Sequence, residues 1–557
     1  MWLVVVDTMQ IQPYIFGSNR LRENAGASYL VDTATRDWAF DAVKKAVPGK
    51  TNIGPENKLI EDSQDNVRKD APRIENGLDA EVWYAGGGNF VVLFKDEEQV
   101  KLFNHKLSRR ALQEAPGLQL VIAQEEMDWD NDVLRDKLDE VLRMLAMQKR
   151  NHAWSAPLLG LSVTLSCRST GLPATGMVEG IRGEPDYPAS DEIRAKVDVA
   201  TPQGTPKSLA DQRLQEVIGL KAGYRYPADF DDLGATEGEY SHIAIVHADG
   251  NGMGQRIREI GNQYATKDKN RAFVLKLREF SIDVEEAARR ALKTLLDKLV
   301  KRINDKDKVI VHQLSQKTSI RIKLAKKDNE YYLPFRPIVF GGDDITFVCD
   351  GRLGLSLATA YLREFEKETD GLGKEGGRLT ACAGVAIVKS HYPFARAYEL
   401  TTDLTKSAKS YRSDTIVGSC LDWHFALSGL SGSIEEIRNR EYKVGERCLT
   451  LRPVTLDTNP DEGEHAWPVV WKGIEAFQKK EWVERRNKIK ALRDALREGP
   501  AAVEHFITAF NENAPLPSVL PKMKSWPSTG WQGNYCGYFD AIELADWFIP
   551  LEREAGH

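Results

Sequence analysis

The chain has 557 residues, of which 42% are hydrophobic and 28% charged, a composition that excludes collagen-like, disordered and membrane-embedded classes for the chain as a whole. Lysine and arginine number 76 against 82 aspartate and glutamate, so the formal net charge is -6 and nucleic acid must be bound by a local basic patch if it is bound at all. The six cysteines are scattered without a C-x-x-C pair, and the start MWLVVVDTMQ lacks the basic region of a signal peptide. We therefore expect a cytoplasmic protein without zinc, disulfides or membrane contact.

A predicted α/β unit begins the chain. Residues 2–7 (WLVVVD) form an apolar run that ends in an aspartate and is typical of a buried strand, and residues 26–47 show helical spacing. Residues 81–94 (EVWYAGGGNFVVLF) place glycines between two β-rich runs, which predicts a hairpin because glycine adopts the positive φ angles of tight turns. A strand at 119–125 and a helix at about 129–149 complete this unit.

The same order of elements returns in the second half of the chain. An apolar strand at 243–249 again ends in an aspartate, and apolar residues three and four apart between 273 and 299 predict a long helix. A second glycine hairpin at 337–348 (PIVFGGDDITFV) precedes a strand at 381–390 and a helix at 393–412. The repeated order predicts a duplicated α/β unit, in which helices pack against one mixed sheet.

Two further segments separate and follow the repeated units. Residues 151–238 are rich in Pro, Gly, Ser and Thr, which predicts a connecting and partly irregular subdomain. Residues 419–557 predict a mainly helical C-terminal domain, with helical spacing at 475–499, a loop at 518–533 and an amphipathic helix in the terminal YFDAIELADWFIPLE. The predicted domains are therefore 1–150, 151–238, 239–418 and 419–557.

Three acids of the second unit are expected to converge at one edge of its sheet. Asp249 ends a buried strand, and Asp343 and Asp344 lie in the hairpin turn of a strand that we expect beside it. Carboxylates with a backbone carbonyl are the usual protein ligands of Mg²⁺ in phosphoryl transfer. GGDD alone also fits an ordinary polar turn, but the strand-end ADGNGMG in the same unit favours a site. We expect the three acids to be catalytic and to bind metal together with Gly250.

Glycines around these acids allow the backbone to approach phosphates closely. The residues expected to contact nucleotide in this way are Asn251, Gly252, Met253, Gly254, Gly341 and Gly342. Three lysines are candidate phosphate ligands: Lys409 and Lys406 share one face of the 393–412 helix, and Lys389 ends the strand before it. For each lysine, a solvated surface charge is the alternative.

The first unit lacks the two hairpin acids. Its turn reads GGGN and ends in Asn89, so that only Asp7 remains, and one carboxylate cannot hold two metal ions. We expect this unit to be catalytically silent. Its loop FGSNRLRENAGAS offers Ser18, Arg20 and Arg22, which are either nucleotide contacts or ordinary residues of a surface loop.

Several of these motifs together resemble one known family. VFGGDDITFV with an upstream HADGNGMG, and YPFARAYELTTDLTKSAKS after GVAIVKS, are similar to the second palm domain of the large polymerase/cyclase subunit of type III CRISPR effector complexes. That palm domain is related to GGDEF diguanylate cyclases and other nucleotide cyclases. YIFGSNRLRENAGAS and YAGGGNFVVLF resemble the degenerate first palm of the same subunit.

The resemblance implies an architecture and a chemistry. The fold would be α/β (α+β), with two ferredoxin-like palms paired as in cyclase dimers and ATP between them. Asp249 and Asp344 would be the main Mg²⁺ or Mn²⁺ ligands, Asp343 would assist, and Lys409 would bind phosphate. Asn251 replaces an acid usual in the family. Neither a His-Asp dipeptide nor zinc-binding cysteine pairs occur, so a shortened relative without the HD nuclease is expected.

The expected function is therefore a metal-dependent nucleotidyltransferase that converts ATP into a cyclic oligoadenylate second messenger in prokaryotic antiviral defence. An effector activated by the product, RNA and CRISPR-type subunits are candidate partners. Two alternatives stay open: a non-catalytic nucleotide-binding scaffold or sensor of a CRISPR-like complex, and a diguanylate-type cyclase.

Overall fold

The computed structural model describes most of the chain, namely residues 1–54, 57, 59, 73–151, 160, 161, 163–202, 204, 207–234, 242–413, 418–426, 432–456, 463–510, 516–520 and 522–552. Parts of the predicted connecting subdomain, 152–159 and 235–238, lie outside the described residues. The chain divides into two compact units. The first comprises Met1–Gly219, Gly252–Glu286 and Phe340–Gly342, and the second comprises Leu220–Asn251, Ala287–Val339 and Asp343–His557.

The first unit contains an antiparallel sheet in the order β2–β3–β1–β4. Its strands are β1 (Trp2–Met9), β2 (Ala80–Gly86), β3 (Asn89–Phe94) and β4 (Gln119–Glu126). The valines of β1 are buried because this strand lies between β3 and β4 and is covered by helices. The strands and the glycine hairpin predicted for this unit are confirmed.

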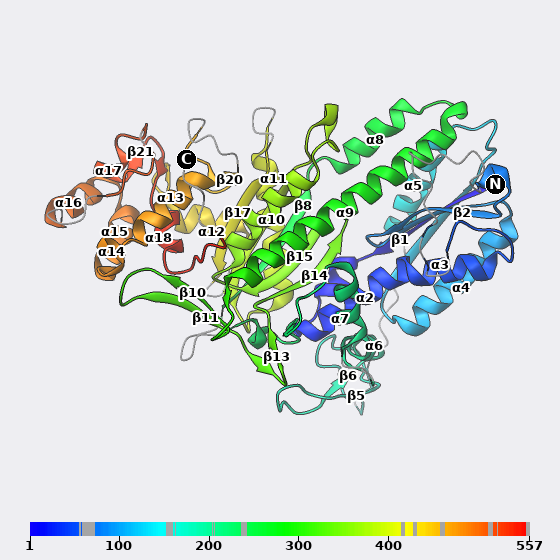
Figure 1. Cartoon of the computed structure of the whole chain (residues 1–557), viewed down its shortest axis with the longest axis horizontal. Helices are drawn as coiled ribbons and strands as arrows, with labels where there is room; N and C mark the ends of the chain where they lie inside the picture. Colours follow the sequence, from blue (N-terminus) through cyan, green and yellow to red (C-terminus); the bar gives the residue numbers. More distant parts are fainter. Residues whose placement is uncertain are drawn as a thin grey trace. The chain divides into compact units, whose positions relative to one another are not determined.

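Helices cover both faces of this sheet. α5 (Leu134–Asn151) packs against β1 and β4, and α4 (Glu97–Glu114) packs against α3 (Asp37–Ala46) and the sheet, as Figure 1 shows. The helix predicted at 26–47 is two helices, α2 (Leu21–Thr35) and α3, because Arg36 leaves the helical region with φ -120° and ψ -80°. The unit further contains α1 (Ile11–Phe16), β5 (Gly176–Val178), β6 (Tyr187–Ala189), α6 (Asp191–Ala200), α7 (Leu209–Val217) and α8 (Met253–Gln263).

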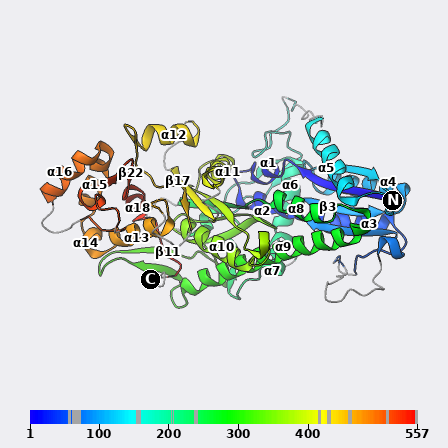
Figure 2. The same ribbon diagram turned by 90° about the horizontal axis from the view of Figure 1, so that it is seen from above.

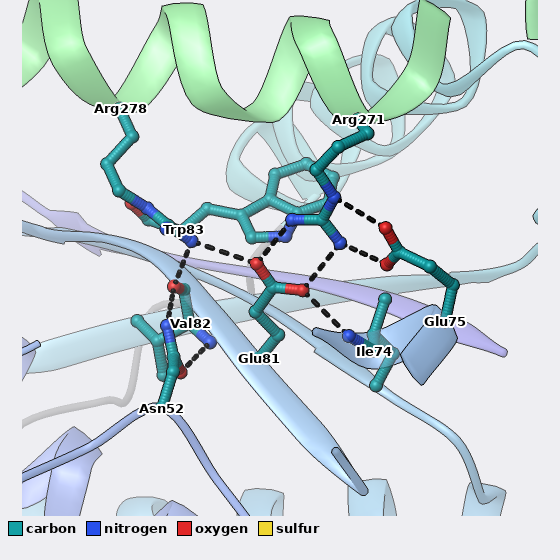
Figure 3. Close-up of polar contacts among 8 residues, drawn as sticks. All are labelled: Asn52, Ile74, Glu75, Glu81, Val82, Trp83, Arg271 and Arg278. Carbon is teal, nitrogen blue, oxygen red and sulfur yellow. Dashed lines mark hydrogen bonds and ion pairs between the residues drawn. The ribbon is translucent and has the colours of Figure 1, made fainter. Parts of the chain in front are cut away.

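The long predicted helix is confirmed as α9 (Asn270–Arg302), whose first part belongs to the first unit. Two arginines of this part reach Glu81 on the edge strand β2, as Figure 3 shows. Arg271 donates to both carboxylate oxygens of Glu81 at 2.7 and 2.9 Å, and Arg278 donates to one at 3.1 Å and to the carbonyl of Val82 at 2.9 Å. Glu81 is only 2% exposed, so these bonds compensate a buried charge, and Arg278 and the Asn52 side chain together satisfy the Val82 carbonyl at the sheet edge.

The second unit is built on a sheet in the order β14–β15–β8–β16–β17–β20. Its strands are β8 (His242–Gly250), β14 (Phe335–Gly341), β15 (Asp344–Asp350), β16 (Ala381–Lys389), β17 (Cys420–Ala426) and β20 (Val454–Thr455). β8 pairs antiparallel with both β15 and β16. The first strand, the hairpin and the later strand predicted for the second unit are confirmed.

α10 (Gly354–Glu368) and α11 (Phe394–Tyr411) cover opposite faces of this sheet, as Figure 2 shows. Both helices approach the strands closely at a glycine. A Cβ on Gly354 would lie 2.4 Å from the Ala244 side chain, and a Cβ on Gly384 would lie 2.3 Å from the Thr401 carbonyl of α11. The sheet is therefore the middle of three layers, and α11 lies directly over β8, β16 and β17.

The two palms share one topology. Each places the second hairpin strand beside the first strand of its unit and the strand before the last helix on the other side. The closing helices, α5 and α11, both have 18 residues. The predicted duplication of an α/β palm fold is thus confirmed. That the two palms pair, with nucleotide between them, stays a prediction, as do the predicted domain boundaries.

The C-terminal part is mainly helical, with corrections to two predicted helices. Helical spacing at 475–499 belongs to the end of α13 (Trp467–Phe477), to α14 (Lys480–Val483) and to α15 (Arg486–Glu498), because the chain turns between them. The predicted terminal helix is only α18 (Phe539–Leu544). The remaining helices here are α12 (Ile434–Glu441), α16 (Pro500–Phe510) and α17 (Trp526–Thr529).

Short strands complete the described structure of the second unit. They are β7 (Tyr224–Arg225), β9 (Ile303–Asn304), β10 (Val309–Gln313), β11 (Ser319–Lys323), β12 (Lys326–Lys327), β13 (Glu330–Tyr332), β18 (Lys443–Val444), β19 (Arg447–Cys448), β21 (Trp531–Gln532) and β22 (Tyr535–Cys536). Among the helices of the described residues, none is long and apolar enough to cross a bilayer.

Candidate active site

Three carboxylates gather where β8 ends and β15 begins, and we call Asp249, Asp343 and Asp344 the acidic edge. β8 and β15 are antiparallel neighbours in which Ala248 pairs with Ile345, so the next residues outward are Asp249 and Asp344. Directly opposed residues of an antiparallel pair have Cβ atoms about 4.5–5.5 Å apart. The structure therefore brings together the acids that the sequence placed on neighbouring strand ends.

Gly250 makes room for the third acid. A Cβ at this position would lie 2.6 Å from both the Cβ and the Oδ2 of Asp343. Only a residue without a side chain allows the hairpin turn to place Asp343 this close to the end of β8. A glycine is needed after Asp249 because two segments of the chain approach each other closely here, and not because Gly250 has a special backbone angle.

The acidic edge is electrostatically strained. The pKa of Asp343 is raised from 3.8 to about 6, chiefly by burial and then by the negative charges of Asp249 and Asp344, against the opposing effect of Lys409. Three carboxylates with one nearby ammonium leave an excess of negative charge. A bound cation would relieve this excess, because it favours the ionised form of every acid around it.

Lys409 lies in the last turn of α11 and reaches the acidic edge. Its Nζ donates to Asp249 Oδ2 at 2.6 Å and to the carbonyl of Gly250 at 3.0 Å. The ammonium thus contacts both a carboxylate and a carbonyl that we predicted as metal ligands. Both oxygens accept hydrogen bonds from a positively charged group in this structure. Their chemistry therefore suits the predicted cation site. Among the described residues, however, no group of three or more His, Cys, Asp or Glu side chains is arranged to hold a metal ion.

One residue of this region was missed by the sequence analysis. His247 lies on β8, is 5% exposed, and its Nδ1 is 3.0 Å from the Thr346 hydroxyl and 3.2 Å from Asp344 Oδ1. The available signal was a histidine inside the apolar run IAIVHAD, where a strand buried on both faces predicts a hydrophobic side chain. It therefore contacts the acidic edge from the buried side of the sheet.

Asn251 and the glycines after it follow the acidic edge along the chain. The Asn251 side chain donates to Thr380 Oγ1 at 2.9 Å, and its backbone N–H donates to the Thr380 carbonyl at 2.8 Å. Gly252 has a positive φ of 70° and precedes α8, which begins with Met253 and Gly254. Asn251 thus fastens the end of β8 to the segment before β16, so its amide is engaged within the fold.

The other predicted nucleotide contacts have different surroundings. Gly342 has a positive φ of 59° in the hairpin turn, and a Cβ on Gly341 would lie 3.2 Å from the Cα of Gly87. Lys406 is exposed and pairs with Asp403 of its own helix at 3.2 Å. The glycine turn therefore has the backbone that only glycine adopts readily, whereas the charge of Lys406 is engaged by a neighbouring acid.

Lys389 is not brought to the acidic edge, and this prediction is wrong. β16 runs antiparallel to β8, so Ala381 pairs with Gly250 while Lys389 pairs with His242 at the opposite end of the sheet. At about 3.3 Å per residue, eight residues of strand separate Lys389 from the acids by roughly 25 Å.

The first unit keeps part of the same arrangement. Asp7 on β1 pairs with Lys149 of α5, and in the register of β1 and β3 it lies opposite Asn89. An amide thus stands where the second palm has Asp344. The side chains predicted to contact nucleotide in this loop are bonded to acids of the protein: Ser18 donates to Glu23 at 2.5 Å, and Arg20 donates to Glu184 at 2.8 Å. Arg22 donates to the carbonyl of Glu179.

Comparison with known proteins agrees with the predicted palm. Residues 242–417 match the family model of the Cas10/Cmr2 second palm domain. No curated protein matches the chain. Among solved structures, it resembles a Csm1–Csm4 cassette in complex with cA4, with 14% identity over 98% of this chain and 70% of that chain and a TM-score of 0.48. Csm1 of T. onnurineus gives 14% identity, coverage of 98% and 69%, and a TM-score of 0.46.

Proposed function

We propose, from the match of residues 242–417 to the Cas10/Cmr2 second palm domain, that the protein is a metal-dependent nucleotidyltransferase. Its substrate would be ATP, and its product a cyclic oligoadenylate that serves as a second messenger in prokaryotic antiviral defence. The base preference and the cyclic product follow from the family resemblance, and the type of reaction follows from the site. CRISPR-type subunits and an effector that senses the product are the partners that this role implies.

The observation that carries the proposal is the acidic edge. Two neighbouring strand ends bring Asp249 and Asp344 side by side, and Gly250 admits Asp343 next to them. The pKa of Asp343 is raised chiefly by burial and also by the negative charge of Asp249, so its carboxylate is ionised at a cost in this place. Such a cluster is costly to maintain in a fold, and cation binding is the function that explains the cost.

The chemistry would be attack of a ribose hydroxyl of one nucleotide on the α-phosphorus of another. A P–O bond forms to the attacking oxygen, the bond to the leaving pyrophosphate breaks, and the hydroxyl proton is lost. Bound Mg²⁺ or Mn²⁺ would lower the pKa of the hydroxyl and stabilise the pyrophosphate. The residues that would hold it are the three acids and the Gly250 carbonyl. Lys409 is placed to exchange Asp249 for a phosphate oxygen, because a flexible ammonium can follow the negative charge.

A non-catalytic nucleotide-binding scaffold is the second candidate. The contact of Lys409 with both Asp249 and the Gly250 carbonyl favours it, because an ammonium that stays there would satisfy these oxygens without a metal ion. The two candidates differ in one property. An enzyme needs the divalent cation for turnover, whereas a scaffold binds nucleotide and leaves it intact.

The test is incubation of the full chain with each labelled nucleoside triphosphate and Mg²⁺, Mn²⁺ or EDTA, followed by mass analysis of the products. We expect cyclic products from ATP that require the metal ion and disappear in the Asp343→Asn/Asp344→Asn double variant. Asp7→Asn is the control for loss of a strand-end acid, because it removes the first-palm counterpart of Asp249, whereas the hairpin acids have no counterpart there. Intact nucleotide under every condition, together with measurable nucleotide binding, would favour the scaffold. Products from GTP instead would point to a diguanylate-type cyclase.

A further inference from the structure

A layer of polar side chains lies beneath the acidic edge, between β8 and α11. His247 packs its ring against Tyr398 of α11 at 5.7 Å between ring centroids, and its Nδ1 is 3.0 Å from the hydroxyl of Thr346. The Thr405 hydroxyl of α11 donates to the backbone carbonyl of His247 at 3.1 Å. We call His247, Thr346, Tyr398 and Thr405 the polar layer.

This layer is unusual for its place in the fold. His247 is 5% exposed, Thr346 0%, Tyr398 4% and Thr405 3%. Polar side chains buried between a sheet and a helix cost free energy unless they are bonded, and apolar residues of similar size would pack there without that cost. A buried polar layer at the foot of a candidate site therefore needs an explanation beyond packing.

The first palm supplies the comparison, because it has the same topology without the hairpin acids. In its sheet Val5, two residues before Asp7, pairs with Val91, two residues after Asn89. In the second palm His247, two residues before Asp249, pairs in the same way with Thr346, two residues after Asp344. The helices α11 and α5 can be aligned on Lys409 and Lys149, the lysines that bind the strand-end aspartates. In this alignment the counterparts of Tyr398 and Thr405 on α5 are Leu138 and Leu145. All four counterparts are apolar.

The polar layer thus occurs in the palm that has the acidic hairpin and is replaced by Val, Val, Leu and Leu in the palm that lacks it. The fold itself does not require these polar groups, since the same layer of the first palm is built without them. Their presence correlates with the acids above them. The direct link between the layer and the acids is His247, whose Nδ1 lies 3.2 Å from Asp344 Oδ1.

We infer that His247 is a positioning residue, which holds the carboxylate of Asp344 toward the cation site while Thr346 and Tyr398 hold the imidazole and Thr405 holds the backbone of His247. This inference rests on the proposed function. Asp344 begins β15 next to the glycine turn and is 43% exposed, so its own strand constrains the carboxylate on one side only. The buried Nδ1 lies 3.2 Å from Oδ1 as a charge contact rather than as a hydrogen bond, and it limits the rotation of this carboxylate, as the partners of metal-binding carboxylates do in other sites.

The test uses the replacement that the first palm already contains. His247→Val in the full chain should fold, because Val5 occupies this position in the other palm. Mn²⁺ binding to the metal-free protein is measured by electron paramagnetic resonance. We expect His247→Val to weaken Mn²⁺ binding at least about 10-fold, the lower end of the range seen when hydrogen-bond partners of metal ligands are removed. The KM for nucleotide at saturating Mn²⁺ should stay the same.

Three further variants separate positioning from packing. His247→Asn places an amide N–H near the position of Nδ1 and should restore most of the affinity for Mn²⁺. His247→Val added to Asp344→Asn should have little further effect if His247 acts through that carboxylate. His424→Val is the control, because His424 is a histidine of the same sheet, 2% exposed, whose ring packs against Tyr442.

The outcomes decide the inference in each case. Unchanged Mn²⁺ affinity in His247→Val, or the same loss with and without Asp344→Asn, would overturn it. If the wild-type chain binds no Mn²⁺, the metal dependence of the proposed function fails. A double-mutant cycle of unfolding free energies, measured without metal, then tests the contact between His247 and Asp344. Non-additive effects of His247→Val and Asp344→Asn on unfolding would then support the contact, and additive effects would overturn it.

Discussion

Asp343→Asn should make the metal-free protein more stable while it removes the response to metal. The carboxylate of Asp343 is held beside Asp249 and Asp344, and its pKa is raised from 3.8 to about 6, chiefly by burial and then by the charge of Asp249. Asparagine has nearly the same shape and carries no charge. The substitution therefore removes the cost of ionising this group and leaves the turn around Gly342 unchanged.

The magnitude follows from the raised pKa. An acid that holds its proton more tightly in the folded state favours folding at low pH, and this contribution is lost as the pH rises from below 3.8 through about 6. At about 1.4 kcal/mol per pKa unit, the folded state bears a penalty of about 3 kcal/mol at pH 8 and roughly half of that at pH 5. Asp343→Asn should therefore stabilise the protein about 1–2 kcal/mol more at pH 8 than at pH 5.

The assay is unfolding of the full chain in EDTA at pH 5 and pH 8, followed by the same measurement with Mg²⁺. Mg²⁺ should stabilise the wild type and leave Asp343→Asn nearly unchanged, because a ligand stabilises only the state that binds it. Asp403→Asn serves as the control, since it removes an exposed carboxylate of α11 and should change stability by less than about 0.5 kcal/mol. A gain for Asp343→Asn that is equal at both pH values, or a loss, would refute the reasoning from buried charge.

The remaining predictions concern single contacts. Gly250→Ala should reduce product formation and Mn²⁺ binding by at least about 10-fold, because the new methyl group would displace Asp343. Calorimetric titration with Mn²⁺ measures the loss of binding. Binding at wild-type strength would argue against the close approach of Gly250 and Asp343. Asp249→Asn should abolish product formation while circular dichroism stays unchanged, and retained synthesis would remove it from the site. Glu81→Ala should lower the unfolding free energy by about 3 kcal/mol in urea titrations, because buried Arg278 and half-buried Arg271 both lose this carboxylate, although Arg271 keeps its pair with Glu75. A change under about 1 kcal/mol would mean that solvent replaces Glu81.

The acidic edge could be predicted because it depends only on strand ends. Asp249 ends one strand, and Asp343 and Asp344 lie in the glycine hairpin before another, so these acids meet if the two strands are neighbours. The order of elements predicts that the strands are neighbours, and β8 and β15 are. Lys409 could be predicted for a similar reason, because the helix after the last strand packs across the sheet and ends over the first strand. Short-range pattern and topology were sufficient for these residues.

Other features depend on information that a single sequence lacks. Lys389 was misplaced because a strand buried on both faces reads the same in either direction, and only the pairing shows that β16 runs antiparallel to β8. The helix at 26–47 breaks at Arg36 without a glycine or proline to announce it. The short pieces α14 and α15 likewise follow one another without such a signal, because tertiary packing ends these helices.

The two palms also bear on what would distinguish the proposed catalytic copy from the copy that we expect to be silent. The ion pair of Lys409 and Asp249 has a counterpart in Lys149 and Asp7, so the pair occurs with and without the hairpin acids. It therefore belongs to the fold that both copies share, where a cation at the end of the last helix neutralises the end of the first strand. What the second palm has in addition is the pair of hairpin acids, the polar layer beneath them, and Gly250 after the strand-end aspartate, where the first palm has Thr8. We expect the proposed reaction to depend on these differences, because the ion pair at the strand end is present in both palms.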